Sequence, residues 1–297
     1  MEEEGLMPPY NFAGLYGSSY EKARFVVLMV PFDSTTTWRA GARDAPFKIL
    51  EASRFLELYD EDLGVVAAEA GIYTLSEIEP IRGDVVKTLE RVEKWVYKVV
   101  KDGKFPVLIG GEHSVSIGGV RGVSRFYEGL AVVVFDSHCD FRDKYEGSKY
   151  SHACSIRRIS EIVDEVLVLG VRSVCEEDVE GIRNGRVSVF WADEVRRDRG
   201  KVFLEVLERL GGYKVYLSVD LDVIDPSQMP SVGTPEPDGL EWGELASLLC
   251  GLCLELDVVG IDFVEGSSCL DAHYSFFSAS KLMYKVMGAI SLRRGWV

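Results

Sequence analysis

The chain has 297 residues, 47% of them hydrophobic, and a formal net charge of −15. That hydrophobic content is ample for a sizeable core and excludes an intrinsically disordered chain. The acidic balance argues against nucleic acid and anionic membranes as partners, and it suits a cationic ligand.

Short apolar runs alternate with longer amphipathic ones, and no linker-like segment divides them, so residues 1–297 are predicted to form a single domain. The predicted strands are 25–30, 105–109, 130–135, 165–169, 187–191, 214–218 and 258–263. The predicted helices are 45–57, 85–100, one from about residue 114, 194–210, 242–254 and about 275–292. Strands that are apolar on both faces and alternate with helices indicate a parallel sheet covered on both sides.

Three motifs at the ends of predicted strands contain most of the residues suited to binding metal. They read GGEHS at 110–114, DSHCD at 136–140 and DLDVIDP at 220–226, and they include two of the four histidines. The carboxyl ends of parallel strands lie at one edge of a sheet, so the three motifs are expected to meet there. The candidate metal ligands are His113, Asp136, His138, Asp140, Asp220 and Asp222.

The spacing of these residues predicts how they are presented. In an extended segment alternate residues share a face, so Asp136, His138 and Asp140 should point into one cavity, with Ser137 and Cys139 pointing elsewhere. Asp220 and Asp222 have the same spacing. Six ligands suffice for two cations if two carboxylates bridge, and oxygen and imidazole ligands favour manganese or a similar metal over a structural zinc. Two such cations can activate a water as a nucleophile.

Other residues of metal-binding type have simpler interpretations. Cys250 and Cys253 form a CxxC, but within an apolar stretch, which favours buried thiols over a redox or zinc pair. Asp225 precedes Pro226 and is interpreted as a turn residue rather than a ligand. His273 is interpreted as structural or incidental. The alternative for the carboxylates of the three motifs is that they cap helices or stabilise turns.

The compartment and source are also predicted from composition. The acidic start, Met1 to Glu4, lacks the basic stretch of a signal peptide, and the longest apolar runs are strand-sized, so a cytoplasmic protein with no membrane span is expected. Asn11, Asn184 and Gln228 are the only amide residues, and charged residues are abundant, which predicts a thermophilic source.

The motifs GGEHS, FDSHCD and SVDLDVIDP resemble the three signatures of the ureohydrolase family, which includes arginases and agmatinases. The segment GTPEP at 233–237 and the early stretch VPFDSTTTWRAGARDAP at 30–46 are most like agmatinases of archaeal type. The similarity runs from about Asn11 to Ile290. It implies a three-layer α/β/α arginase-like fold around a mostly parallel eight-stranded sheet, and hydrolysis of a guanidino group to urea and an amine.

The resemblance also implies a site with two Mn²⁺ per subunit. Carried over by position, one metal would be held by His113, Asp136, Asp140 and Asp220, and the other by Asp136, His138, Asp220 and Asp222. His152 matches the family's histidine beside the substrate, and Glu265 matches the glutamate that pairs with the guanidinium. Asp140 is the candidate proton donor to the leaving amine, with His152 a shuttle to solvent. The alternative for His152 is a surface histidine in a polar loop with its hydrogen bonds satisfied. The alternative for Glu265 is a solvated charge at the end of a strand.

Agmatine is the expected substrate, giving urea and putrescine, and N1-aminopropylagmatine is the alternative within the class. Arginine and guanidino acids rank lower, because GTPEP and the acidic surface favour a cation without a carboxylate. A single-zinc deacetylase of the same fold and a catalytically silent scaffold subunit are further alternatives, opposed by the intact ligand set. A homo-oligomer, trimeric or hexameric, is implied by the resemblance. The chain departs from the family pattern at Ser231, Val232, Asp238 and 266–269, which are expected to line or support the substrate pocket.

Overall fold

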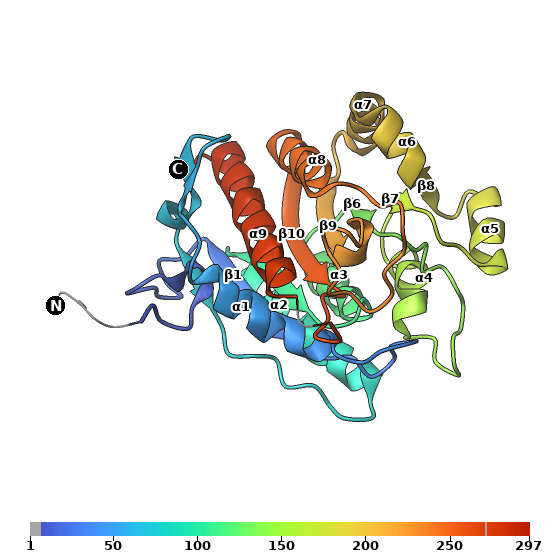
Figure 1. The fold of residues 1–297 in the computed structure, drawn as a ribbon, viewed down its shortest axis with the longest axis horizontal. Coiled ribbons are helices and arrows are strands. Elements are labelled where there is room, and N and C mark those ends of the chain that lie inside the picture. The colour runs from blue at the N-terminus through green and yellow to red at the C-terminus, as the bar shows by residue number, and fades with distance from the viewer. Residues whose placement is uncertain (1–6, 271) are drawn as a thin grey trace.

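A computed structural model describes residues 7–270 and 272–297, so the acidic segment at residues 1–4 lies outside the described part. Its centre is one sheet of eight strands in the order β4-β1-β5-β10-β9-β6-β7-β8 (Figure 1). Every pairing within this sheet is parallel. The strands are β1 (Phe25–Val30), β4 (Ile72–Thr74), β5 (Phe105–Gly110), β6 (Leu130–Phe135), β7 (Glu165–Val171), β8 (Ser188–Trp191), β9 (Lys214–Asp220) and β10 (Asp257–Val264).

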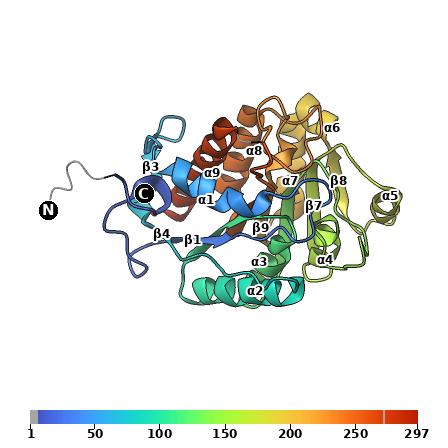
Figure 2. The same cartoon turned by 60° about the horizontal axis from the view of Figure 1, so that its bottom comes forward.

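Helices cover both faces of the sheet, as Figure 2 shows. One layer contains α1 (Ala45–Ser53), α6 (Ala192–Arg197), α7 (Arg199–Leu210), α8 (Trp242–Glu255) and α9 (His273–Arg294), and the other contains α2 (Val85–Lys101), α3 (Val115–Ser124) and α4 (Ser155–Ile159). The buried side chains form two clusters, one on each face. Along β5, for example, Val107 and Ile109 belong to one cluster and Leu108 to the other. The predicted three-layer α/β/α fold is confirmed.

Some elements differ from the sequence-based predictions. All seven predicted strands are present, and the eighth is β4, a three-residue edge strand too short to give a pattern. The helix predicted over 194–210 is two helices, because Asp198 leaves the helical conformation and its side chain caps α7 by accepting a hydrogen bond from the Lys201 amide (3.0 Å). The helix α5 (Glu176–Arg183) and the small antiparallel pair β2 (Tyr59–Asp60) and β3 (Val65–Val66) were not predicted.

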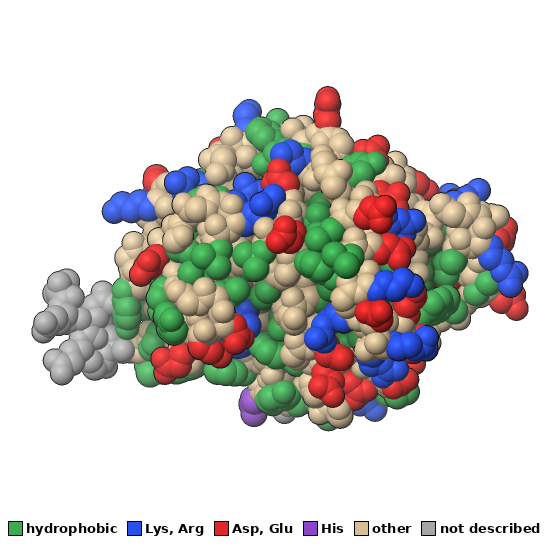
Figure 3. Space-filling model, turned by 90° about the horizontal axis from the view of Figure 1, so that it is seen from above, with side chains coloured by type: hydrophobic (Ala, Val, Ile, Leu, Met, Phe, Trp, Pro, Cys, Tyr) green, Lys and Arg blue, Asp and Glu red, His purple; other side chains and the backbone are tan. Residues whose placement is uncertain are grey.

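Among residues 7–270 and 272–297, no helix is long and apolar enough to cross a bilayer. On the face shown in Figure 3, acidic and basic side chains are interspersed. This face therefore does not present a patch of a single charge.

Gly111 allows the ends of β1 and β5 to approach closely. A Cβ atom at this position would lie 1.9 Å from the carbonyl oxygen of Phe32. The next amide, of Glu112, donates to that same oxygen (2.8 Å), and the Gly111 carbonyl accepts from the Glu265 amide (2.8 Å). This glycine thus joins the segment after β1 to two segments that carry predicted site residues, His113 and Glu265.

The Gly111→Ala variant should be destabilised by about 3 kcal/mol, because the added methyl group overlaps a backbone atom that cannot move aside alone. The matched control is Gly243→Ala in α8, where nothing lies within 4 Å of the new methyl group. That variant should be up to about 1 kcal/mol more stable than the wild type. Urea-induced unfolding measures both, and a wild-type midpoint for Gly111→Ala would contradict the prediction.

Candidate metal centre and active site

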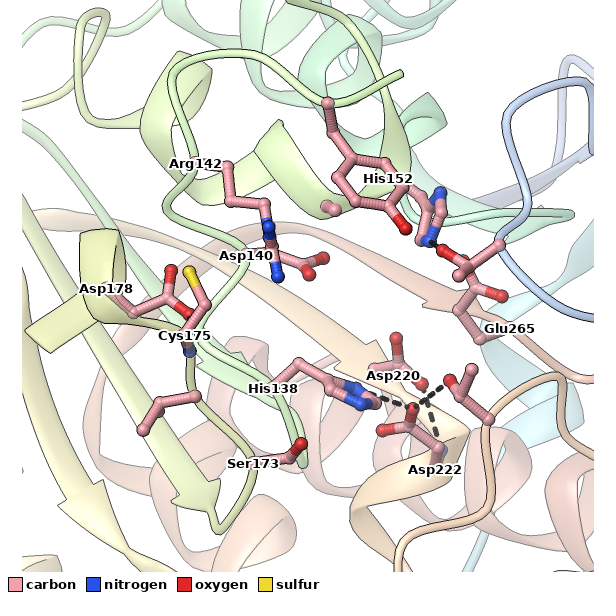
Figure 4. Close-up of a pocket in the computed structure, with 15 residues that line it drawn as sticks. His138, Asp140, Arg142, His152, Ser173, Cys175, Asp178, Asp220, Asp222 and Glu265 are labelled. Atoms are coloured by element: carbon pink, nitrogen blue, oxygen red, sulfur yellow. Dashed lines mark hydrogen bonds and ion pairs between the residues drawn. The ribbon is translucent and has the colours of Figure 1, made fainter.

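The six predicted ligands come together at the carboxyl edge of four adjacent strands. His113 follows β5, Asp136 follows β6, and Asp220 is the last residue of β9. Figure 4 shows His138, Asp140, Asp220 and Asp222 around one cavity, with Glu265 and His152 also lining it. The order β5-β10-β9-β6 therefore places the three motifs side by side.

The first ligand group surrounds Nδ1 of His113. This nitrogen lies 3.1 Å from Asp136 Oδ2, 3.3 Å from Asp140 Oδ2 and 3.2 Å from Asp220 Oδ2. Both His113 Nδ1 and Asp136 Oδ2 are buried without a hydrogen-bond partner among the described residues. Buried polar atoms are rarely left unpaired. A cation between these atoms would satisfy both.

The second ligand group surrounds Nδ1 of His138. This nitrogen lies 3.1 Å from Asp222 Oδ2 and 3.6 Å from Asp136 Oδ1. Asp136 therefore offers one oxygen to each group, which is the position of a bridging ligand. Asp220 lies in the first group, but its Oδ1 accepts a hydrogen bond from the Asp222 amide (2.9 Å). Its predicted contact with a second metal stays a prediction.

A buried hydrogen-bond chain orients His113. Its Nε2 lies 3.0 Å from the Ser218 hydroxyl, which donates to Asp262 Oδ1 (2.6 Å). The other oxygen of Asp262 accepts from the Tyr216 hydroxyl (2.8 Å). With Nε2 occupied, Nδ1 is the nitrogen that faces the carboxylates, an arrangement typical of metal-binding histidines. Neither Ser218 nor Asp262 was a predicted site residue, although a lone aspartate within an apolar strand was a usable signal.

The carboxylates crowd one another in the absence of a cation. Burial and the charge of Asp136 raise the pKa of Asp140 to about 6. Burial and Asp222 raise the pKa of Asp220 well above its ordinary value. Burial opposes a proton on His113, yet the surrounding carboxylates raise the pKa of His113 well above its ordinary value. The centre therefore attracts positive charge, either protons or metal ions.

The metal-free protein should lose stability as the pH rises. Because the pKa of Asp140 rises from 3.8 to about 6 on folding, the folded state binds more protons than the unfolded state between those values, so unfolding becomes easier as pH increases through that window. The raised pKa of His113 has the same sign, since its stabilising proton is lost at high pH. Asp222 acts in the opposite direction, because His138 lowers its pKa and stability is therefore gained as the pH rises. This gain is complete once the pH exceeds the pKa of Asp222 in the unfolded chain.

Added Mn²⁺ should therefore raise the melting temperature more at about pH 7.5 than at about pH 5.5, because metal and protons compete for the same ligands. Thermal unfolding with and without Mn²⁺ at both pH values measures this. An equal gain at the two pH values would show that protons do not occupy the metal ligands.

Two of the predicted catalytic residues have strained backbones. Asp140 has φ +47° and Glu265 has φ +62°, a left-handed conformation that costs non-glycine residues about 1–3 kcal/mol. Such strain is concentrated at functional sites, where a side chain must be aimed against local preference. It aims both carboxyl groups into the cavity (Figure 4).

The prediction that simple alternation presents the ligands is wrong in part. The strand ends at Phe135, and Asp140 reaches the cavity through its left-handed backbone. Ser137 does not point elsewhere, since its hydroxyl donates to Asp222 Oδ1 (2.7 Å). Asp222 lies in a short 3-10 helix, Leu221–Val223, rather than in an extended segment. Cys139 is buried in the core on the α3 side, as expected.

The cavity beside the ligands has a volume of about 210 Å³. All three predicted catalytic residues, Asp140, His152 and Glu265, line it, whereas His113 and Asp136 lie fully buried. Burial lowers the pKa of His152 to about 4, so its imidazole is neutral at pH 7. The remaining lining residues are Thr37, His138, Arg142, Tyr145, Ala153, Ser173, Val174, Cys175, Asp178, Asp220, Asp222 and Thr234.

The residues that were interpreted as structural lie outside this cavity. Asp225 accepts hydrogen bonds from the Ser227 and Gly239 amides (2.9 and 3.0 Å), which is the pattern of a turn. Cys250 and Cys253 are buried thiols in α8. His273 is exposed at the start of α9.

The residues that depart from the family pattern contact one another or the surface, and not the cavity. The Ser231 carbonyl accepts from the Ser267 amide (2.7 Å), and Val232 pairs with Gly266 in a single antiparallel bridge. Asp238 forms an ion pair with Arg196 at the surface. None of these residues lines the described cavity.

Fold and site together define a metallohydrolase built on a parallel α/β sheet, with carboxylate and imidazole ligands at its carboxyl edge. Residues 23–288 match the family model described as Arginase family. The chain belongs to the arginase family and is a ureohydrolase.

Individual relatives agree with this assignment. The chain is 39% identical to an N(1)-aminopropylagmatine ureohydrolase of Synechocystis sp., over 91% of this chain and 90% of that protein. It is 36% identical to an N(1)-aminopropylagmatine ureohydrolase of Thermococcus kodakarensis, over 91% and 92%. Among solved structures, an agmatine ureohydrolase of Thermoplasma volcanium superposes with a TM-score of 0.86 at 34% identity and covers 94% of each chain.

Proposed function

We propose that this ureohydrolase acts on an agmatine-type polyamine, with N1-aminopropylagmatine as its substrate and agmatine as the second candidate. The observation that carries the choice is the similarity, at 39% and 36% identity over nearly the whole chain, to two proteins named for the aminopropyl compound. The superposition on an agmatine ureohydrolase supports the second candidate, which is also the substrate expected from the sequence. Both are cations without a carboxylate, in keeping with the net charge of −15.

We assign Mn²⁺, two per subunit, to His113, Asp136, His138, Asp140, Asp220 and Asp222. The donor set consists of carboxylate oxygens and imidazole nitrogens, which suits Mn²⁺. When bound, such a pair of cations supplies an activated water. Metal analysis of protein loaded separately with Mn²⁺ and Zn²⁺, followed by activity assays, tests the assignment.

The chain's own residues orient the substrate and move protons. Glu265 pairs with the guanidinium, which stays charged and is well matched to a carboxylate. One Glu265 oxygen, Oε1, is held by the His113 amide (2.6 Å), which leaves Oε2 for the substrate. Asp140 delivers a proton to the leaving nitrogen as the carbon–nitrogen bond breaks, and the neutral His152 exchanges protons with solvent.

Urea release from Mn²⁺-loaded protein tests the proposed reaction. N1-aminopropylagmatine should be cleaved with a kcat/KM about tenfold or more above that of agmatine, and arginine should be a poor substrate. A preference for agmatine would select the second candidate. Absence of urea from every guanidino compound would refute the proposal.

We also propose that the protein forms a homo-oligomer, a trimer or hexamer. Light scattering coupled to size-exclusion chromatography measures the mass directly, and a monomer of 33.1 kDa would refute this part.

A further inference from the structure

His152 is hydrogen-bonded to the loop between β1 and α1. The Thr37 hydroxyl lies 2.8 Å from Nε2 of His152, the contact drawn as a dashed line from His152 in Figure 4. The Thr35 hydroxyl accepts a hydrogen bond from the His152 backbone amide (2.9 Å) and lies 3.4 Å from Nδ1. Two threonines, two positions apart in the chain, thus face the two ring nitrogens.

The Thr35 hydroxyl donates its hydrogen to Glu112 and not to His152. This hydroxyl donates to Glu112 Oε1 (2.6 Å), and the Thr35 amide donates to Glu112 Oε2 (2.6 Å). Glu112 is fully buried and also accepts from the Ser114 hydroxyl (2.5 Å). Three donors, two from Thr35 and one from Ser114, converge on the Glu112 carboxyl group, so the single hydrogen of the Thr35 hydroxyl is directed there and a Thr35 lone pair faces Nδ1.

This arrangement selects one form of the neutral imidazole. A bare Nδ1 would face the lone pair of Thr35, whereas a protonated Nδ1 can donate to it. The Ser151 hydroxyl, 3.3 Å from Nδ1, can donate or accept and so favours neither form. With the proton on Nδ1, Nε2 is free to accept from Thr37, and the short 2.8 Å contact fits that hydrogen bond.

We infer that Thr37 is a positioning residue that links Nε2 of His152 to the cavity, and that Glu112, through Thr35, sets the tautomer that makes this link possible. The inference rests on the proposed role of His152 as a proton shuttle. Thr37 itself lines the cavity. A donor in the cavity gives a proton to Thr37 Oγ1 while Thr37 passes its own proton to Nε2, and the reverse transfer returns a proton toward the leaving nitrogen. The hydroxyl is unchanged after each transfer.

The loop is held independently of Thr37. At its start, the buried Asp33 accepts hydrogen bonds from the Gly41 amide (2.9 Å) and the Arg43 amide (3.3 Å), and it pairs with the Arg43 guanidinium. Thr37 is exposed. Substitutions at this residue should therefore remove the hydroxyl without releasing the loop or unfolding the protein.

The first test compares Thr37→Val with Thr37→Ser in the Mn²⁺-loaded protein. Thr37→Val should lower kcat about 10- to 100-fold, with KM and metal content within about twofold of the wild type, because only the proton path is cut. Thr37→Ser restores the hydroxyl and should recover most of the lost kcat. Wild-type kcat in Thr37→Val, or no recovery in Thr37→Ser, would overturn the inference.

The second test reads the tautomer directly and needs no turnover. The chain has four histidines, so ¹⁵N-histidine spectra of the wild type and of His152→Asn identify the His152 signals by difference. The wild type should show Nδ1 protonated and Nε2 bare, and Thr35→Val should shift the population while Thr35→Ser should not. A bare Nδ1 in the wild type would overturn the inference. Wild-type turnover in His152→Asn would instead refute the proposed shuttle, so the two failures are distinguishable.

Discussion

The Asp136→Asn variant is expected to lose both metal binding and urea formation. Asp136 places one oxygen 3.1 Å from His113 Nδ1 and the other 3.6 Å from His138 Nδ1, so it belongs to both ligand groups. The amide keeps the size of the side chain but replaces one oxygen with an NH₂ group that cannot bind a cation, and it removes a charge. We expect kcat/KM to fall by at least about 10³-fold, equivalent to about 4 kcal/mol.

Metal analysis and a urea assay measure this effect together. The control is Asp143→Asn, an exposed aspartate of the same segment that pairs with Arg158 and Lys149 at the surface. That variant should bind two metals per chain and keep its activity. Two bound metals and full turnover in Asp136→Asn would contradict the assignment of Asp136 as the shared ligand.

The melting temperature of Asp136→Asn, measured with and without Mn²⁺, distinguishes loss of metal binding from loss of the fold. In the metal-free state Asp136 adds to the charge repulsion that raises the pKa of Asp140 and Asp220. Removing that charge should leave the metal-free melting temperature at or above the wild-type value, while added Mn²⁺ should no longer raise it. A large drop in the metal-free melting temperature would indicate a structural role instead.

Glu265→Gln should have the second largest effect, on substrate recognition rather than on metal content. Glu265 is the cavity carboxylate with an oxygen, Oε2, available to a guanidinium, because its Oε1 is held by the His113 amide. Glutamine has nearly the same shape but cannot offer a charged partner. Losing one partner of a buried charge pair costs about 3–4 kcal/mol, so kcat/KM should fall about 10²- to 10³-fold.

Steady-state kinetics and metal analysis distinguish this role from metal binding. Glu265→Gln should retain both metals, since Glu265 belongs to neither ligand group. Its metal-free stability should be close to that of the wild type, because burial already raises the pKa of Glu265 well above its ordinary value and a neutral group costs less to bury. The control, Glu255→Gln at the exposed end of α8, should be fully active. Unchanged kcat/KM in Glu265→Gln would refute the pairing.

The position of the ligands along the chain could be predicted because it depends on local spacing. Apolar runs ended at the polar motifs, and the carboxyl ends of parallel strands share one edge, so His113, Asp136 and Asp220 were expected to meet. The resemblance added His152 and Glu265, and both line the cavity. The eighth strand, β4, left no pattern in three residues.

The orientation of the side chains could not be predicted in the same way. Alternation failed for Asp222 and Asp140, because a 3-10 turn and a left-handed backbone replace the extended chain beyond the strand ends. The supporting groups were missed as well: Asp262 acts on His113 through Ser218, and Glu112 acts on His152 through Thr35.

The sequence by itself determined which residues this arginase-family ureohydrolase brings to its centre, since short motifs after buried strands specify both the residue types and the strand ends. Only the tertiary structure decided which nitrogen of each histidine is free and which hydroxyl has a proton to give. The physical reason is that a hydrogen bond commits a proton to one partner, and here the partners are far apart in the chain: Thr35 and Glu112 are separated by 77 positions, and Thr35 and His152 by 117.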